Sequence, residues 1–232
     1  MIDFHSHILP GIDDGSRSVR ESCELLSMLS KQGIDKVIAT PHFYADNESV
    51  DEFLGRRKAS FEALSAELTD DMPEILLGAE VRYYQGISHL EKLRDLRIEN
   101  SDLLLLEMPF CRWTEYTVKE MSEINNLGSV NVVLAHIERY FEFWNDKYID
   151  ELLHHGILMQ VNASFFLELL TRRKALKMLQ NNTVQLIGSD CHGTDRRPPH
   201  IGEAVARISK KFGEGFVKYI SDYENSLFYG NR

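Results

Sequence analysis

Seven short apolar runs in this chain each end in a metal-binding or polar side chain, and this recurrence limits what the chain can fold into. The stretches between the runs carry the three-to-four-residue periodicity and the boundary residues of helices. Alternating strands and helices predict a parallel α/β barrel, in which the strand ends meet at one face. One convergent metal site is therefore the leading hypothesis. The runs end at His7, His42, Glu80, Glu107, His136, Asn162 and Asp190.

The length of the chain suits a single domain over residues 1–232, because one α/β barrel with a sizeable core occupies about this many residues. No linker, low-complexity segment or further repeat is visible. Residues 43–57 are polar and lack a clear start signal, so we expect a loop that leads into a helix. The expected helix starts are the capping boxes Ser18/Glu21 and Thr117/Glu120, and the N-caps Asn145 (helix 146–155) and Ser164 (helix 165–181).

Charge and cysteine content exclude some classes of protein. The formal net charge of −10 argues against a nonspecific grip on nucleic acid or on an anionic membrane, although it permits a local positive site. The start of the chain has no signal-peptide pattern, and no apolar stretch is long enough to span a bilayer. Three scattered cysteines fit a reducing compartment. We therefore expect a cytoplasmic protein without membrane insertion, and a homo-oligomer remains open.

Two pairs of candidate ligands mark the first and last runs. His5 and His7 lie two apart on a predicted strand, so they point to the same face and can bind one ion together. Asp190 and His192 repeat that spacing in the last run. In a closed barrel the last strand lies beside the first, so the two pairs would face each other. The other candidates at strand ends or in a nearby loop are Asp14, His42, Glu80, Glu107 and His136.

The chemistry of these ligands narrows the choice of metal. Five imidazoles and four carboxylates without a thiolate suit Mn²⁺, Mg²⁺, Fe or Zn²⁺ better than Cu(I) or an iron–sulfur cluster. The set is large enough for two or three divalent ions. With three ions and four carboxylates, the site would carry a formal charge of about +2, which matches a phosphate dianion.

These residues resemble the PHP family of phosphoesterases, and within it the bacterial tyrosine-protein phosphatases of capsular and exopolysaccharide operons. The resemblance spans nearly the whole chain. Two departures are visible, since Ser16 stands where proline is expected and Cys191 lies between the ligands of the last motif. Neither removes a ligand, so they put the substrate range in doubt more than catalysis. The motifs that carry the resemblance are residues 2–7, 13–15, 78–80, 135–140, 189–192 and 197–200.

The resemblance implies a distorted barrel of seven parallel strands, (β/α)7 and TIM-like, that holds two or three ions, with Mn²⁺ expected first. It implies hydrolysis of phosphotyrosine and opposition to a bacterial tyrosine kinase that controls polysaccharide assembly. Arg139 and Arg197 match the phosphate-binding arginines of the family. The implied ligand sets are His5, His7, Glu80 and Asp190 for one ion, Glu80, Glu107 and His136 for the second, and Asp14, His42 and His192 for the third.

The mechanism expected from this resemblance is in-line attack on phosphorus by a metal-activated hydroxide, because bound cations lower the pKa of water towards neutrality. Both arginines would bind the non-bridging phosphate oxygens. Aromatic residues beyond the strand ends, such as Tyr44 and Phe110, are candidates for a rim around the substrate ring, although ordinary packing is the better explanation for any single one.

Four alternatives stay open at this stage. The same metal chemistry would serve a phosphatase of a small phosphate ester, or a nuclease or amidohydrolase on a related barrel. A catalytically silent metal-binding regulator is the third alternative. The last is a cysteine-nucleophile phosphatase, because Cys191 and Arg197 match the pattern Cys-x5-Arg. Pro198 and Pro199 argue against it, since that chemistry requires a helix N-terminus after the arginine.

Overall fold

The structure, a computed structural model that describes residues 1–126 and 128–229, is built around parallel strands. Hydrogen bonds link the strands into two sheets, in the orders β1-β2-β4 and β3-β5-β6-β7-β8-β9, and the described pairings are all parallel. The strands are β1 (Ile2–Ser6), β2 (Lys36–Ala39), β3 (His42–Phe43), β4 (Glu74–Leu77), β5 (Glu80–Arg82), β6 (Leu103–Glu107), β7 (Asn131–Leu134), β8 (Leu158–Asn162) and β9 (Leu186–Gly188).

Two segments of the chain run through both sheets, because β2 continues into β3 and β4 continues into β5. Short interruptions at residues 40–41 and 78–79 separate β2 from β3 and β4 from β5. The backbone stays hydrogen-bonded across the interruption, since Gly78 N donates to Ala39 O at 2.8 Å. Gly78 also lies close to its neighbours, because an added Cβ would come 3.0 Å from the Ile98 side chain. Each path therefore bends as it passes from one sheet into the other.

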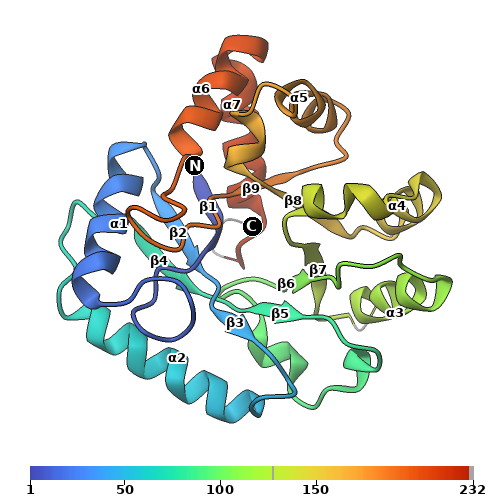
Figure 1. Ribbon diagram of the computed structural model, residues 1–232, viewed down its shortest axis with the longest axis horizontal. Helices are drawn as coiled ribbons and strands as arrows, with labels where there is room; N and C mark the ends of the chain where they lie inside the picture. The colour runs from blue at the N-terminus through green and yellow to red at the C-terminus, as the bar shows by residue number, and fades with distance from the viewer. Residues whose placement is uncertain (127, 230–232) are drawn as a thin grey trace.

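The first and last strands also meet. Asp190 N, just after β9, donates to His5 O at 2.7 Å, and His7 N donates to Cys191 O at 3.0 Å. The result is a curled parallel sheet with helices on its outside (Figure 1). The sequence prediction of an α/β protein is confirmed, and the curl brings the carboxyl ends of the strands to one face.

A bulge in β1 sets the direction of its two histidines. Asp3 pairs with Val37 and Ser6 pairs with Ala39, so β1 contains one more residue than β2 between these two pairs. One inserted residue turns the side chains that follow it to the other face of a strand. The bulge is held by the Asp3 side chain, whose Oδ1 accepts a hydrogen bond from the backbone N–H of His5 at 3.2 Å.

Helices surround the sheet, as Figure 1 shows. Among the described residues, no helix combines the length and apolar character needed to cross a membrane. The helices are α1 (Val19–Lys31), α2 (Val50–Ser65), α3 (Glu115–Asn125), α4 (Asp146–His154), α5 (Arg172–Gln180), α6 (Ile201–Phe212) and α7 (Glu214–Ser226), with short 3₁₀ helices η1 (Ile87–His89), η2 (Leu93–Leu96), η3 (Ile137–Phe143) and η4 (Ala163–Phe166).

Two of the predicted helix starts are confirmed. Ser18 caps α1 by accepting from Glu21 N, and Asn145 caps α4. The predicted box Thr117/Glu120 is wrong, because α3 starts earlier, with Thr114 as its N-cap. The prediction for residues 43–57 also missed a start signal, since Ser49 and Glu52 form a capping box for α2.

The predicted helix 165–181 with Ser164 as its cap is wrong as well. The chain forms η4, then a turn, and α5 begins only at Arg172. Side chains donate hydrogen bonds to the backbone carbonyl groups that would accept backbone N–H groups in a continuous helix. Thr171 Oγ1 donates to Phe165 O at 2.8 Å, and Arg172 Nη2 donates to Leu167 O at 2.7 Å. The interruption leaves the segment 167–171 as a projecting turn.

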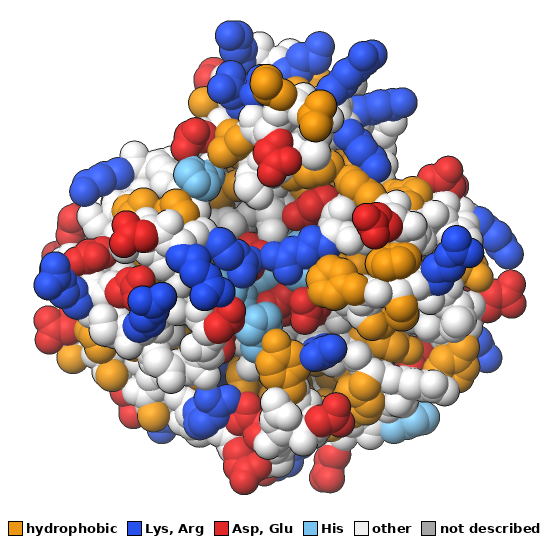
Figure 2. Space-filling model, viewed as in Figure 1, with side chains coloured by type: hydrophobic (Ala, Val, Ile, Leu, Met, Phe, Trp, Pro, Cys, Tyr) orange, Lys and Arg blue, Asp and Glu red, His pale blue; other side chains and the backbone are white. Residues whose placement is uncertain are grey.

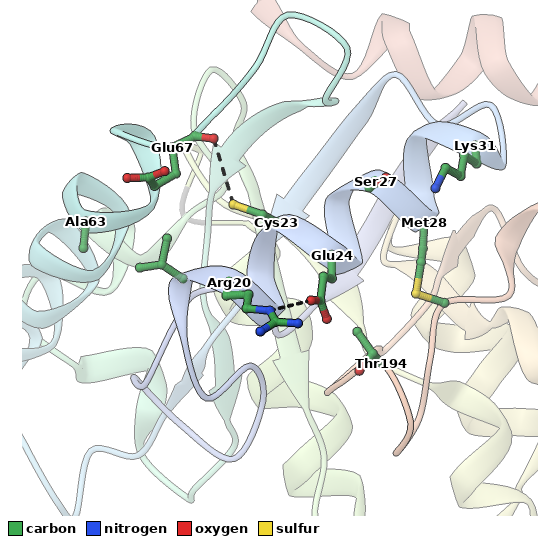
Figure 3. Close-up of a pocket in the computed structure, with 10 residues that line it drawn as sticks. Arg20, Cys23, Glu24, Ser27, Met28, Lys31, Ala63, Glu67 and Thr194 are labelled. Atoms are coloured by element: carbon green, nitrogen blue, oxygen red, sulfur yellow. Dashed lines mark hydrogen bonds and ion pairs between the residues drawn. The ribbon is translucent and has the colours of Figure 1, made fainter.

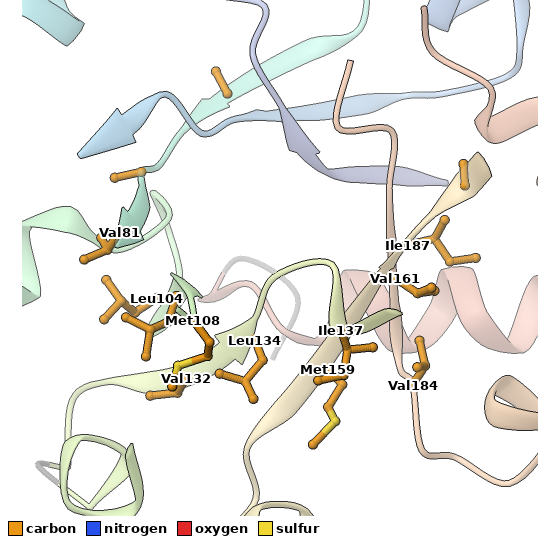
Figure 4. Close-up of a cluster of buried hydrophobic side chains, with 14 of the residues drawn as sticks. Val81, Leu104, Met108, Val132, Leu134, Ile137, Met159, Val161, Val184 and Ile187 are labelled. Carbon is orange, nitrogen blue, oxygen red and sulfur yellow. The ribbon is translucent and has the colours of Figure 1, made fainter. Parts of the chain in front are cut away.

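The apolar core has two parts, which follow from the alternation of side chains along the strands. The larger part lies between the sheet and the helices and includes Leu104, Leu106, Val132 and Leu134 (Figure 4). The smaller part is made by residues that alternate with these. It contains Phe4, Ile38, Leu76, Leu103, Leu105, Val133 and Leu186, together with Phe228 from the segment after α7.

Glu224 on α7 is a buried carboxyl group at the edge of this core. Its Oε2 accepts a hydrogen bond from Ile2 N at 3.0 Å, while Oε1 has no hydrogen-bond partner. Burial raises the pKa of Glu224 to about 8. The folded protein therefore binds a proton that the unfolded chain releases at a lower pH.

We predict that Glu224 weakens the protein as the pH rises. The folded pKa of about 8 exceeds the ordinary value of 4.5, so stability falls between these two pH values. Relative to Glu224→Gln, the wild type should lose on the order of 5 kcal/mol of unfolding free energy across this range, at about 1.4 kcal/mol for each unit by which the pKa is raised. Urea unfolding of both proteins at several pH values measures the difference. Parallel pH profiles would contradict the prediction.

Candidate metal centre

Glu80 lies at the centre of the cluster and is almost fully buried. Its Oε2 is 3.1 Å from His5 Nε2, 3.2 Å from His7 Nε2 and 3.0 Å from His42 Nδ1. Its Oε1 is 2.8 Å from His136 Nε2. Four imidazoles from β1, β3 and the end of β7 therefore surround one carboxylate, as the strand-end pattern predicted.

Asp190 forms the second centre of charge. Its Oδ1 lies 3.7 Å from His5 Nε2 and 3.6 Å from His7 Nε2. Its Oδ2 forms ion pairs with the guanidinium groups of Arg139 and Arg197. The structure thus brings both predicted arginines to the same carboxylate that faces the β1 histidines.

Two more carboxylates complete the predicted set. Asp14 Oδ1 lies 3.5 Å from His42 Nε2 and 3.3 Å from His192 Nε2, and its side chain is half exposed. Glu107 Oε1 lies 3.5 Å from His136 Nε2. In three groups of residues, the potential ligand atoms all lie within 4.8 Å of one another. These groups are His7/Asp14/His42/His192, His5/His7/Asp190 and His42/Glu80/Glu107.

The predicted site residues therefore all gather at one place. Figure 2 shows histidine side chains at the bottom of a hollow, bordered by both basic and acidic side chains. A cavity of about 740 Å³ adjoins the cluster and is lined by residues that include Asp14, His42, Tyr44 and Arg56. A separate groove of about 920 Å³ lies on the flank of α1 and contains no histidine (Figure 3).

The protonation of the cluster shows how strongly it attracts positive charge. Burial lowers the pKa of His7, but hydrogen bonds to Asp13 and Glu80 outweigh burial and raise it to about 10. Burial likewise raises the pKa of Asp190, but the neighbouring imidazoles hold it below its ordinary range. His192 differs, because burial lowers its pKa to about 4, which leaves a neutral imidazole. Metal ligation requires neutral imidazoles and ionised carboxylates.

Several contacts fit divalent cations better than protons. His5 Nε2 faces His7 Nε2 at 3.2 Å, and two such nitrogens can share a proton or a cation between them. Glu80 Oε2 and His42 Nδ1 are buried without a hydrogen-bond partner, although they lie 3.0 Å apart. Buried polar atoms are normally satisfied. The donor set and these two atoms therefore fit a metal centre.

The backbone at the site is strained and tightly packed. His136, Asp190 and Arg197 have positive φ angles of 32°, 52° and 58°, which side-chain-bearing residues seldom adopt. Gly188 is required next to His5, since an added Cβ would lie 2.5 Å from His5 Cβ. The fold holds these residues in unfavourable conformations, and such strain is common at functional sites.

Residues that the sequence analysis left out of the site orient the candidate ligands. Gln160 Oε1 accepts from His136 N at 2.7 Å and lies 3.2 Å from His5 Nδ1. Gln160 Nε2 donates to Asn162 Oδ1 at 3.0 Å, and Asn162 Nδ2 donates to Asp190 Oδ2 at 2.8 Å. The available signal was two polar residues at alternate positions of an otherwise apolar strand.

Asp13 is the other residue that was missed. Its Oδ2 lies 2.7 Å from His7 Nδ1 and accepts a hydrogen bond from His42 N at 3.1 Å. One carboxylate thereby fixes the ring of one candidate ligand and the backbone of another. Gly15 N donates to the other oxygen of Asp13 at 2.9 Å.

Cys191 does not fit the role of a nucleophile. Its side chain is fully buried in the apolar core, and burial raises the pKa of the thiol. A nucleophilic cysteine needs a lowered pKa and access to the substrate.

The aromatic residues divide into two groups. Tyr140 is buried against Phe110 and Trp113, with ring centroids 5.7 Å and 5.4 Å away, so it serves packing. Its hydroxyl also accepts a hydrogen bond from Met108 N. Tyr44 instead stacks on His42 at 5.3 Å, and Phe110 is exposed. Tyr44 and Phe110 therefore remain available at the rim.

Fold and cluster together define an α/β protein with a buried histidine–carboxylate centre. Residues 1–228 match the family described as "Capsular polysaccharide synthesis, CpsB/CapC", and the chain belongs to this family. A relative named tyrosine-protein phosphatase CpsB, from Streptococcus pneumoniae, is 33% identical over 226 residues, covering 92% of this chain and 91% of the relative. Tyrosine-protein phosphatase YwqE from Bacillus subtilis is 28% identical over 219 residues, covering 92% and 85%.

A solved structure is similar over the full length. It belongs to the crystal structures of YwqE from Bacillus subtilis and CpsB from Streptococcus pneumoniae, described as unique metal-dependent tyrosine phosphatases. The TM-score is 0.84 at 25% sequence identity, and the match covers 100% of this chain and 95% of that chain. The curled parallel sheet is therefore a shared architecture.

We predict that Asp13→Asn weakens metal binding. The substitution keeps the size of the side chain but removes the charge that holds His7, so affinity for Mn²⁺ should fall about 10-fold to 100-fold. Titration calorimetry with Mn²⁺ measures the change. Asp46→Asn, at an exposed position, is the matched control and should bind like the wild type. Equal affinities for all three proteins would contradict the positioning role.

Proposed function

We propose that this chain is a metal-dependent protein-tyrosine phosphatase, a phosphoric monoester hydrolase. The observation that carries the proposal is the convergence of imidazoles and carboxylates on Glu80, beside two arginines that share Asp190. The names of the relatives, tyrosine-protein phosphatase CpsB and YwqE, support the same activity. The family description supports a role in capsular polysaccharide synthesis.

The ligand sets that the family resemblance implies are part of the proposal. The contacts around Glu80 and Asp190 support the first ion, and the contacts of Glu80 with His136 and of Glu107 with His136 support the second. The contacts of Asp14 support the third. We propose two or three ions, with Mn²⁺ as the natural metal, because oxygen and imidazole ligands suit it. The ions would be held by His5, His7, Asp14, His42, Glu80, Glu107, His136, Asp190 and His192.

The chain's own residues would bind and orient the phosphate. Divalent ions at this site supply Lewis-acid charge that lowers the pKa of water and attracts a phosphate dianion. Arg139 and Arg197 form ion pairs with Asp190. Their guanidinium groups are suited to bind the non-bridging phosphate oxygens. Tyr44 and Phe110 would flank the substrate ring. A phenol with a pKa of about 10 leaves more readily than an alcohol, so the site needs little general-acid help.

The proposal also covers the number of strands and the closure of the barrel. We propose a distorted (β/α)7 barrel within a single domain, residues 1–232. The continuity of β2 with β3 and of β4 with β5 leaves seven strand paths, and the hydrogen bonds between the ends of β1 and β9 support closure. The match over residues 1–228 supports one unit.

The physiological setting is proposed from the family. The substrate would be a phosphotyrosine protein, namely a bacterial tyrosine kinase that controls capsular or exopolysaccharide assembly, and the enzyme would act in the cytoplasm. The overall negative charge supports the absence of nucleic acid among its partners. A small phosphate ester is the alternative substrate, since the same centre binds any phosphate dianion.

We predict that metal, and not the thiol, carries the activity. EDTA-treated protein should release no phosphate from a phosphotyrosine peptide, and Mn²⁺ should restore release. Cys191→Ser should keep most of the turnover, because the thiol is buried. Phosphate release from phosphotyrosine and phosphoserine peptides measures both points. An inactive Cys191→Ser protein together with EDTA resistance would refute the metal mechanism, and a preference for phosphoserine would refute the substrate class.

We also predict separate effects on turnover and on metal content. Arg139→Met should lower kcat about 100-fold to 1000-fold, because it removes a donor that stabilises charge in the transition state. Its Mn²⁺ content should stay that of the wild type, since Arg139 contacts Asp190 from outside the ligand groups. Steady-state kinetics and metal analysis on the same sample test this. Loss of metal along with activity would show a ligand-supporting role instead.

A further inference from the structure

One part of the surface stands apart from the acidic character of the chain. Figure 2 shows Lys and Arg side chains gathered over the lobe that Figure 1 assigns to α5 and α6. We call this surface the basic lobe. It consists of Arg173 and Lys177 on α5, Lys210 and Lys211 on α6, and Leu169 and Leu170 on the projecting turn before α5.

The cations of the basic lobe are free of acidic partners. In the part of the chain that the structure describes, Arg173, Lys177, Lys210 and Lys211 form no ion pair. Exposed lysines on other helices do form such pairs, for example Lys58 with Glu62. In a chain of net charge −10, this unpaired positive charge needs a reason.

The lobe also exposes apolar surface. Leu169 and Leu170 are 85% and 95% exposed. A groove of about 610 Å³ beside them is lined by Leu169, Leu176 and Phe212, and by Arg173, Lys177 and Lys211 among other polar residues, with no acidic residue in its lining. Apolar side chains within a basic rim match a partner that carries both acidic and apolar groups.

The basic lobe adjoins the phosphate-binding side of the metal centre. Lys174 on α5 lies 3.0 Å from the ring centroid of Phe141, and Phe141 packs on Phe165 at 5.4 Å. Phe141 belongs to η3, the same short helix that carries Arg139. The lobe and the hollow with the histidines are visible on the same face in Figure 2. A polypeptide that enters the hollow can therefore continue across the lobe.

We propose that the basic lobe docks an acidic segment, containing apolar residues, of the phosphotyrosine protein substrate. This inference rests on the proposed phosphatase function and adds a second contact to it. A narrow acidic segment meets only the lobe, whereas an extended anionic surface such as a membrane would also meet the negative remainder of the protein. The groove beside Leu169 accepts an apolar side chain of that segment.

The test compares two phosphotyrosine peptides of equal length. One carries an extension of alternating acidic residues and leucine, and the other carries serine and glycine in place of these. With the wild type and Mn²⁺, kcat/KM for the acidic peptide should be about tenfold higher, through KM, and NaCl should erase the difference. Arg173→Glu with Lys177→Glu should also abolish it, and Leu169→Ser with Leu170→Ser should reduce it.

Controls separate the lobe from general effects. Lys58→Glu with Lys119→Glu reverses the same amount of charge on α2 and α3 and should retain the preference. The lobe variants should hydrolyse the serine–glycine peptide like the wild type, and thermal unfolding checks that they fold.

Three outcomes would overturn the docking proposal. The first is equal kcat/KM for both extended peptides, and the second is an equal loss of preference in the lobe and control variants. The third is lobe-dependent binding to phosphatidylglycerol vesicles without any peptide preference. Absence of turnover with both peptides would instead refute the phosphatase function on which the proposal rests.

Discussion

A carboxylate buried among four imidazoles is the interaction on which the rest of this structure depends. Removing an ionised carboxylate from water costs several kcal/mol unless other charges compensate it. Around Glu80 the compensation comes from histidines that approach to 2.8–3.2 Å. Rings that carry protons repel one another, and His5 Nε2 and His7 Nε2 lie only 3.2 Å apart. Divalent cations at this site would remove this conflict, because neutral imidazoles and ionised carboxylates would then share the same positive charge.

The fold supplies the geometry that makes such burial possible. Curling the sheet places the end of β1 against the segment after β9, so that residues far apart in sequence share one space. The bulge in β1 sets the direction of His5 and His7, and Gly188 leaves room for His5. Backbone strain at His136 and Asp190 is offset by hydrogen bonds from the scaffold, including the chain from Gln160 through Asn162 to Asp190.

The sequence indicated which candidate ligands gather at one place, but it did not indicate the residues that support them. His5 and His7 stand out because imidazoles are rare at alternate positions of a buried strand, and the strand-end pattern extended this reasoning to Glu80, Asp190 and the other candidate ligands. Gln160 escaped attention because an amide on a strand has ordinary explanations, and its partner His5 is far away in sequence. The bulge in β1 was also invisible, since it depends on pairing with β2.

Some predictions of helix boundaries were wrong for a related reason. Thr117 has the spacing of a capping box with Glu120, but Glu120 is taken by tertiary contacts, accepting hydrogen bonds from Tyr83 Oη at 2.7 Å and Gly86 N at 2.8 Å. Thr114 then serves as the cap. In the same way, hydrogen bonds from the side chains of Thr171 and Arg172 interrupt the helix expected over 165–181. Local patterns predict helices, but contacts with distant elements decide where they begin.

The most direct measurement of the central claim is anomalous diffraction from crystals grown with Mn²⁺, recorded at the manganese absorption edge. The account predicts strong peaks within bonding distance of Glu80, one of them shared with His5, His7 and Asp190. A structure with ample Mn²⁺ in the crystal but no anomalous peak beside Glu80 would contradict it.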